Sequence, residues 1–294
     1  MMENRWHQGE QLIQELAGTK QKMVVVGQKY IREYMPLQHQ QFFQAQTMIF
    51  IAYRDATATI KSSVLFGEVG FIYSPSDTEL WINTQNPMSD FRHDEVTVGD
   101  RIGLLGIEFN TKRRNRVNAI ITEINQKYMK VSVLQSYGNC PKYIQPKTLV
   151  TNPQYDPSGL ISKTTLNNDI ESLIVQSDTF FIASYFDDGK QKRNRGADIS
   201  HRGGEVGFVK VNESGQLLVE DYPGNGFFNT LGNLMANPRA CLLFCDWRGG
   251  HALQIKVTCE IIWSDKASET QRTLCFTPQE FTVLSNSLAF RHKA

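Results

Sequence analysis

Residues 195–233 read RGADISHRGGEVGFVKVNESGQLLVEDYPGNGFFNTLGN, and this stretch predicts a β-hairpin with polar ends. The apolar runs Val206–Val211 and Leu217–Val219 are the expected strands. Asn212–Gly215 is the expected turn, because Asn, Ser and Gly adopt turn conformations that β-branched residues resist. The word GEVGF within the stretch matters for the whole chain, because it occurs a second time.

Polar residues flank the predicted hairpin. Asp198, Ser200, His201 and Arg202 precede its first strand, and the loop Asp221–Gly226 follows its second. Small loop residues let backbone amides approach a ligand, and a cation beside them suits a phosphate group. The alternative is a polar surface turn, in which His201 is a hydrogen-bonding surface residue rather than a general acid or base.

The sequence contains an internal repeat. GEVGF occurs at Gly67–Phe71 and again at Gly204–Phe208. Shorter matches follow the same order in both halves: Phe50–Ala52 with Phe181–Ala183, Arg101, Leu104 and Leu105 with Arg239, Leu242 and Leu243, and Val117 and Ile121 with Val257 and Ile261. This shared order predicts a tandem duplication.

Runs of β-branched and aromatic residues between turn residues predict a mainly β fold, in which a six-stranded antiparallel barrel with flanking helices is duplicated. Strands are expected in the first half at 47–53, 57–64, 69–73, 79–82, 101–109, 116–124 and 129–134, and helices at 10–16, 36–46 and 167–176. The expected organisation is an N-terminal extension at 1–34, a first copy at 35–140, a proline-rich linker at 141–164 and a second copy at 165–294.

Composition excludes several classes of protein. The 294 residues include 31 Lys and Arg against 30 Asp and Glu, so the basic footprint of a nucleic-acid binder is absent. The five cysteines form no C-x-x-C pair, which argues against a disulfide framework and a zinc site. No metal-ligand spacing, export signal or membrane span is visible, and a cytoplasmic protein is expected.

Two copies in one chain can pack as an intramolecular pseudo-dimer, with a ligand site where they meet. The second copy is expected to carry most of that site. Where it reads DISHRGG, the first copy reads IKSSVLFG and has neither the arginine nor the downstream Gly-Asn loop. Association of two such chains into a homodimer is also compatible with the sequence.

Three longer words carry a family resemblance: ADISHRGGEVGFV, DYPGNGFFNTLGNL and NPRACLLFCDW. Together they resemble the pyridoxamine 5′-phosphate oxidase-like, FMN-binding split-barrel family. The words GLLGIEFNTKRRNRVN and GNCPKYIQ of the first half resemble its two-domain branch, whose members are predicted flavin-nucleotide-binding proteins. The resemblance spans roughly residues 35–265.

The resemblance implies an FMN site formed by both halves. FMN contacts in the second half are implied for Asp198, Ile199, Ser200, His201, Arg202, Val219, Glu220, Asp221, Gly224, Asn225 and Thr230. Arg202 stands where the family has a lysine, and Gly-Asn replaces the family's Arg-Lys pair. From the first half, Asn139, Cys140, Lys142 and Tyr143 are implied to reach the phosphate, and Arg114 and Asn115 the flavin ring.

The implied function is an FMN-dependent oxidoreductase that transfers hydride or electrons at the flavin ring, with NAD(P)H or another small redox substrate. A flavin carries its own redox chemistry, so no side-chain acid or base is required. The alternatives are a non-enzymatic flavin carrier or sensor, and a binder of a deazaflavin or haem. Pyridoxamine phosphate oxidase activity is not expected, because the C-terminal tail offers only Arg291, His292 and Lys293 as basic residues.

Overall fold

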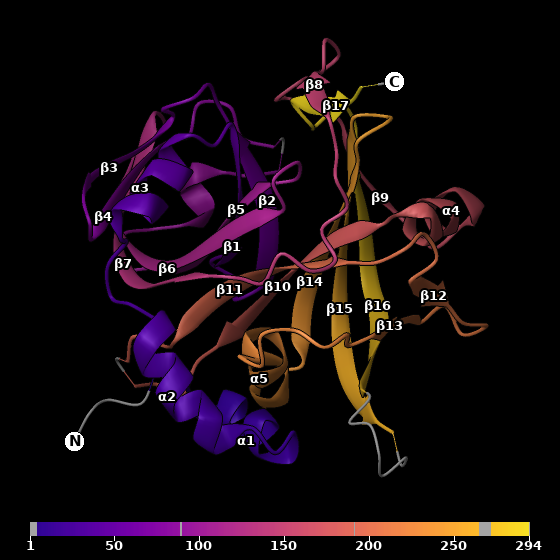
Figure 1. Cartoon of the computed structure of the whole chain (residues 1–294). Coiled ribbons are helices and arrows are strands. Elements are labelled where there is room, and N and C mark those ends of the chain that lie inside the picture. Colours follow the sequence, from indigo (N-terminus) through magenta and orange to yellow (C-terminus); the bar gives the residue numbers. More distant parts are fainter. Residues whose placement is uncertain (1–4, 89, 191, 265–271, 294) are drawn as a thin grey trace.

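Two antiparallel sheets, one from each half of the chain, form most of the computed structural model, which describes residues 5–88, 90–190, 192–264 and 272–293 (Figure 1). The first sheet contains β1 (Met48–Arg54), β2 (Ile60–Phe66), β3 (Ile72–Ser76), β4 (Glu79–Asn83), β5 (Arg101–Glu108), β6 (Arg113–Ile124) and β7 (Tyr128–Gly138). The second contains β10 (Thr179–Phe186), β11 (Gly196–Gly203), β12 (Val209–Val211), β13 (Leu217–Glu220), β14 (Arg239–Asp246), β15 (His251–Trp263) and β16 (Arg272–Leu284). The mainly β class predicted from the sequence is confirmed.

The two sheets repeat one strand order. It is β2-β1-β5-β6-β7-β4-β3 in the first half and β11-β10-β14-β15-β16-β13-β12 in the second. β1 therefore corresponds to β10, and each later strand of the first sheet to the matching strand of the second. This common topology agrees with the internal repeat in the sequence.

The repeated word GEVGF forms the same turn in both halves. Gly70 has φ 92° and Gly207 has φ 88°, a region that residues with a Cβ rarely adopt. The turn closes through the Phe71 N–H to the Glu68 carbonyl at 2.9 Å, and through the equivalent Phe208 bond at 3.0 Å. The turn occupies part of the strand expected at 69–73, and β3 accordingly begins at Ile72.

Alanine at Gly70 or at Gly207 is therefore expected to destabilise the protein by about 1–2 kcal/mol, by a similar amount at both positions. Urea unfolding measures this free energy. Gly224→Ala is the matched control, because Gly224 has no positive φ and its added Cβ would meet open space. A large effect at only one of the two turns would contradict their equivalence.

One sequence match is wrong by two residues. Val117 pairs with Leu104, and Ile255 pairs with Leu242, the equivalent of Leu104. Val117 therefore corresponds to Ile255 and not to Val257. A shift of two keeps the same strand face, which is why the apolar pattern matched in either register.

Apolar side chains form separate clusters inside each half and a further cluster between the halves. Phe50 of β1 and Phe181 of β10, which are equivalent in the repeat, stack at the centre of the cluster between the halves with their ring centroids 3.6 Å apart. The His201 ring packs edge-on against Phe181, so the polar residues of β11 lie next to this apolar cluster. The halves thus bury one face of each sheet against the other.

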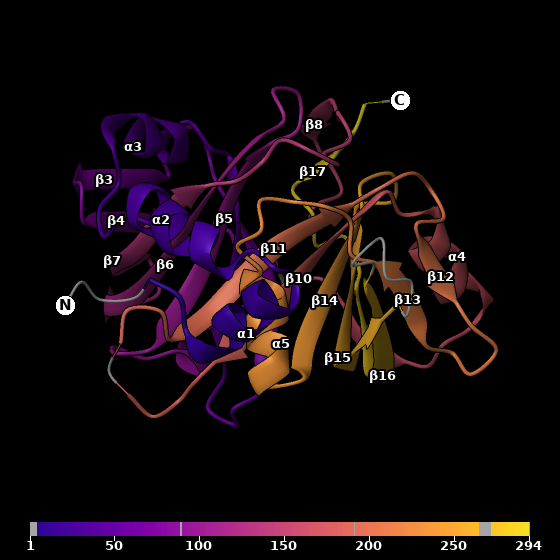
Figure 2. The ribbon, with the colours of Figure 1, turned by 60° about the horizontal axis from the view of Figure 1, so that its bottom comes forward.

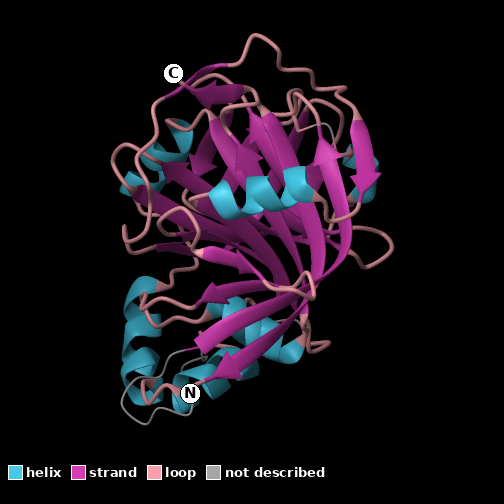
Figure 3. Ribbon diagram, turned by 90° about the vertical axis from the view of Figure 1, so that its right-hand side faces the viewer, coloured by secondary structure: helices cyan, strands magenta, loops and turns pink. Residues whose placement is uncertain are grey.

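Helices lie around the sheets (Figure 3). They are α1 (Gln8–Leu16), α2 (Lys20–Tyr30), α3 (Leu37–Gln44), α4 (Asn168–Gln176), α5 (Asn229–Ala236) and the short 3-10 helix η1 (His93–Glu95). The sequence predicted α1, α3 and α4 but neither α2 nor α5. The Val24–Val26 run in α2 has low helix propensity, and α5 follows directly after a glycine-rich loop. Among the described helices, none is long and apolar enough to cross a membrane.

Three further expectations differ from the structure. Asp198–Arg202 do not form a loose polar end before the hairpin, because they lie within β11, which pairs with β10 along its whole length. Within residues 141–164, expected as a linker, β8 (Leu149–Thr151) pairs with β17 (Phe290–His292), and β9 (Ile161–Thr164) pairs with β16. The hairpin strand expected from Val206 begins at Val209.

Candidate functional site

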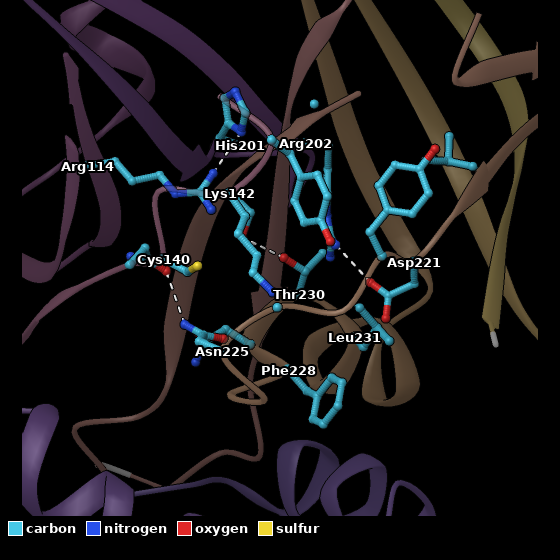
Figure 4. A pocket seen from close by; sticks show the side chains of 18 of the residues that line it. Arg114, Cys140, Lys142, His201, Arg202, Asp221, Asn225, Phe228, Thr230 and Leu231 are labelled. Carbon is cyan, nitrogen blue, oxygen red and sulfur yellow. Dashed lines mark hydrogen bonds and ion pairs between the residues drawn. The ribbon is translucent and has the colours of Figure 1, made fainter. Parts of the chain in front are cut away.

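A pocket of about 100 Å³ lies where β6 and the segment after β7 meet β11, the loop after β13 and the start of α5 (Figure 4). Residues from both halves of the chain line it. Most of the site residues predicted from the sequence are among them: Arg114, Asn139, Cys140, Lys142, Tyr143, Ser200, His201, Arg202, Val219, Glu220, Asp221, Gly224, Asn225 and Thr230.

Three predicted residues do not line this pocket. Ile199 is buried among the apolar side chains between the halves. Asn115 alternates on β6 with Arg114 and therefore faces a separate groove beside α3. Asp198 is 2% exposed and lies behind the pocket wall, where it accepts hydrogen bonds from other site residues.

Hydrogen bonds connect the two halves across the pocket. The Asn225 side-chain amide donates to Asn139 Oδ1 at 3.4 Å, and the Tyr143 hydroxyl donates to the Pro223 carbonyl at 3.1 Å. The Arg114 guanidinium donates to His201 Nδ1 at 2.7 Å. The structure therefore brings residues 139–143 beside the loop after β13, as the seam hypothesis requires.

The pocket contains more cationic groups than its carboxylates neutralise. Arg116 Nη1 lies 3.1 Å from Asp198 Oδ1, and Arg202 Nη1 lies 2.8 Å from Asp221 Oδ1. Arg114 has no carboxylate partner among the described residues, and its buried Nε has no hydrogen-bond partner there. Burial, with Arg116 and Arg202 nearby, lowers the pKa of Arg114 to about 9. An anion in this pocket would supply the missing negative charge.

His201 is buried, with 5% of its surface exposed, so the interpretation as a surface residue is wrong. A guanidinium can only donate, so Nδ1 of His201 accepts from Arg114 and its ring proton lies on Nε2. Burial and the cations Arg114 and Arg202 lower the pKa of His201 well below its ordinary value. The Nε2–H is buried without a partner among the described residues and can donate to a ligand.

The N-terminus of α5 supplies backbone donors to the same pocket. Phe228 precedes the helix with φ 60° and makes no side-chain capping bond, while Asn229, Thr230 and Leu231 of the first turn line the pocket. Uncapped N–H groups at a helix start attract anions. The Thr230 hydroxyl donates to Ser200 Oγ at 2.7 Å, which ties this turn to β11.

Sequence reasoning missed two parts of the site. It expected Arg113–Arg116 as a hairpin that could point at the seam between the halves, but assigned only Arg114 and Asn115 of this segment to the ligand site. Residues Leu231 and Leu234, three apart and both buried, were the available signal for α5.

These donors suit an anionic group bound in the space of about 100 Å³ between them. A wider groove of about 680 Å³ begins on the other side of the loop after β13. Tyr222 and Phe228 line both spaces, and Trp263 adds a further ring to the groove. The described residues include no group of three or more His, Cys, Asp or Glu side chains that could hold a metal ion.

No protein-family model matches the chain, and no curated protein matches it either. Solved structures match in part. A protein from Clostridium acetobutylicum related to general stress protein 26, of the pyridoxinephosphate oxidase family, matches 40% of this chain and 86% of its own, at 15% identity and a TM-score of 0.28. An FAD-binding protein from Mesorhizobium loti matches 43% of this chain and 99% of its own, at 11% identity and a TM-score of 0.28. The haem storage protein HutZ from Vibrio cholerae matches 42% of this chain and 96% of its own, at 10% identity and a TM-score of 0.29.

Proposed function

We propose that this chain is an FMN-binding redox protein that holds the FMN phosphate in the pocket between its halves. The observation that carries the proposal is Arg114, a cation with a buried Nε and no carboxylate partner among the described residues, beside the uncapped start of α5. A phosphate would neutralise the charge of Arg114 and accept hydrogen bonds from the backbone N–H groups at the start of α5. The resemblance of the sequence to FMN-binding split barrels names FMN among the phosphate ligands that this geometry accepts.

The residues of the chain have distinct parts in this proposal. Arg114, Arg202 and the first turn of α5 bind the phosphate, and Asn225 with Asn139 closes the pocket across the seam. Asp221 holds Arg202 in place by a 2.8 Å ion pair. The flavin itself supplies hydride or electron transfer when bound, so the protein needs to hold and orient it.

Purified protein is expected to bind FMN at least about tenfold more tightly than riboflavin, because only FMN carries the phosphate that the cations recognise. Fluorescence titration with both ligands measures the ratio, and FMN should also raise the melting temperature. Equal affinities for FMN and riboflavin, or a melting temperature that FMN fails to shift, would refute the phosphate assignment.

A non-enzymatic flavin carrier is the second candidate. The contacts of the pocket, including the neutral His201 bonded to Arg114, are all binding contacts, and a carrier requires no others. Anaerobic mixing of the FMN-loaded protein with NADPH or NADH separates the candidates: bleaching of the flavin absorbance supports an oxidoreductase, and an unchanged spectrum supports a carrier. Mass spectrometry of the native protein tests for a deazaflavin or haem instead.

A further inference from the structure

The N-terminal helices α1 and α2 pack against the elements that form the ligand pocket (Figure 2). We propose that this helical pair supports the wall of the flavin pocket from behind, and that Glu10 of α1 is a positioning residue that holds Asn229 at the start of α5. The inference rests on the proposed function and assigns the N-terminal extension to the same site.

The backbones of α1 and α5 are in direct contact. A Cβ added to Gly9 would overlap the Gly232 carbonyl oxygen, and a Cβ added to Gly232 would overlap the backbone of Glu10. Glycine at both positions allows this approach. A shift of α1 must therefore move α5, whose first turn lines the pocket.

Buried hydrogen bonds extend from α1 to the pocket wall. Glu10 is 4% exposed and accepts from the Asn229 side-chain amide at 2.6 Å, and from the His7 backbone N–H at 2.8 Å. Asn229 Oδ1 in turn accepts from Arg116 at 3.4 Å. Glu10 is thus hydrogen-bonded directly to Asn229, which lines the pocket, and through Asn229 it is connected to the Arg116–Asp198 ion pair.

The loop after β13 is held by the same helices. The Phe227 ring lies 5.1 Å from the Trp6 ring and 5.9 Å from the Tyr137 ring, in a cluster that also includes Met23. The Gln14 side-chain amide donates to the Phe227 carbonyl at 3.2 Å. Both ends of the segment that contacts the ligand, the loop and the first turn of α5, therefore depend on the N-terminal pair.

The charge state of Glu10 gives this arrangement a measurable signature. Burial raises the pKa of Glu10 to about 8, against the opposing effects of its hydrogen bonds to His7 and Asn229. The charged or titratable groups that face it are His7, Asp198, Arg116 and Tyr137. The carboxyl is therefore protonated at neutral pH. As the pH rises through about 8 it ionises, competes with Asp198 for Arg116 and adds negative charge near a site for an anion.

The test measures FMN affinity between pH 7 and 9 for wild type, Glu10→Gln, Glu10→Ala and Glu15→Gln. Glu10→Ala is expected to bind about five- to tenfold more weakly at pH 7, because Asn229 loses its acceptor. Glu10→Gln keeps an acceptor and cannot ionise, so its affinity should stay near wild type at pH 7 and fall less as the pH rises. Glu15→Gln makes the same substitution on the same helix at a side chain that is 63% exposed, and should follow wild type at every pH.

The possible outcomes separate the positioning role of Glu10 from the proposed binding of FMN. Arg114 titrates in the same range in all four proteins, so the ratio of each variant to wild type isolates Glu10. If wild type binds FMN and the Glu10 variants match it at every pH, the positioning role is wrong while the proposed function stands. If wild type fails to bind FMN, the proposed function and the inference both fail. Should Glu10→Ala not fold, the pH dependence of Glu10→Gln alone decides.

Discussion

Replacing Arg114 with methionine is expected to weaken FMN binding about 10- to 100-fold without lowering the melting temperature of the ligand-free protein. Arg114 has no carboxylate partner among the described residues, and its buried Nε has no hydrogen-bond partner among them. Removing it deletes a charge-assisted contact to the phosphate. Methionine retains the apolar stem and removes an uncompensated charge, which offsets the lost bond to His201.

Arg113→Met is the matched control for this substitution. Arg113 is the preceding residue of β6, is exposed, and binds the Gln38 carbonyl away from the pocket. Its loss should change FMN affinity less than about twofold, which isothermal titration calorimetry resolves. The phosphate role of Arg114 is contradicted if both variants bind FMN alike, or if Arg114→Met lowers the ligand-free melting temperature by more than about 5 °C.

The strand pattern and the repeat were predictable because both depend on local sequence. Alternating β-branched residues mark strands wherever they occur, and GEVGF needs the same positive φ at Gly70 and Gly207. α5 was not predictable in this way. Its one glycine, Gly232, and its short length give it little intrinsic helix propensity. It is stabilised by backbone contact between Gly232 and α1, which lies more than two hundred residues earlier in the chain.

The residues that line the pocket were predictable where short sequence words mark them, and were missed where their position depends on packing between distant segments. Arg202 and Asn139 could be placed from the words around them. Arg116 was expected at the seam only as one of the hairpin residues Arg113–Arg116, because its ion pair depends on the start of β6 at Arg113 and on Asp198 of the facing strand. Glu10 lies 219 residues from Asn229, and no local pattern links the two.

Asp198→Asn is expected to destabilise the protein by about 3–5 kcal/mol, because it leaves Arg116 buried without a counter-charge. Both Arg116 and Asp198 are buried, and the Tyr137 and Ser200 hydroxyls also donate to this carboxylate. Adding Arg116→Met removes the stranded cation and should restore most of the loss. Urea unfolding of the two single variants and the double variant measures the coupling between the two charges.

An exposed pair of the same chemistry provides the control. Arg92 and Asp94 form a 2.7 Å ion pair in which both side chains are 67% exposed, and solvent screens their interaction. Asp94→Asn should therefore leave the urea midpoint and the unfolding free energy close to those of wild type. If Asp198→Asn costs no more than this control, or if Arg116→Met fails to rescue it, the pair is not what holds Arg116 in the wall of the pocket. Because Arg116 also donates to Asn229, destabilisation at Asp198 together with weaker FMN binding would show that stability and the ligand site share one buried network.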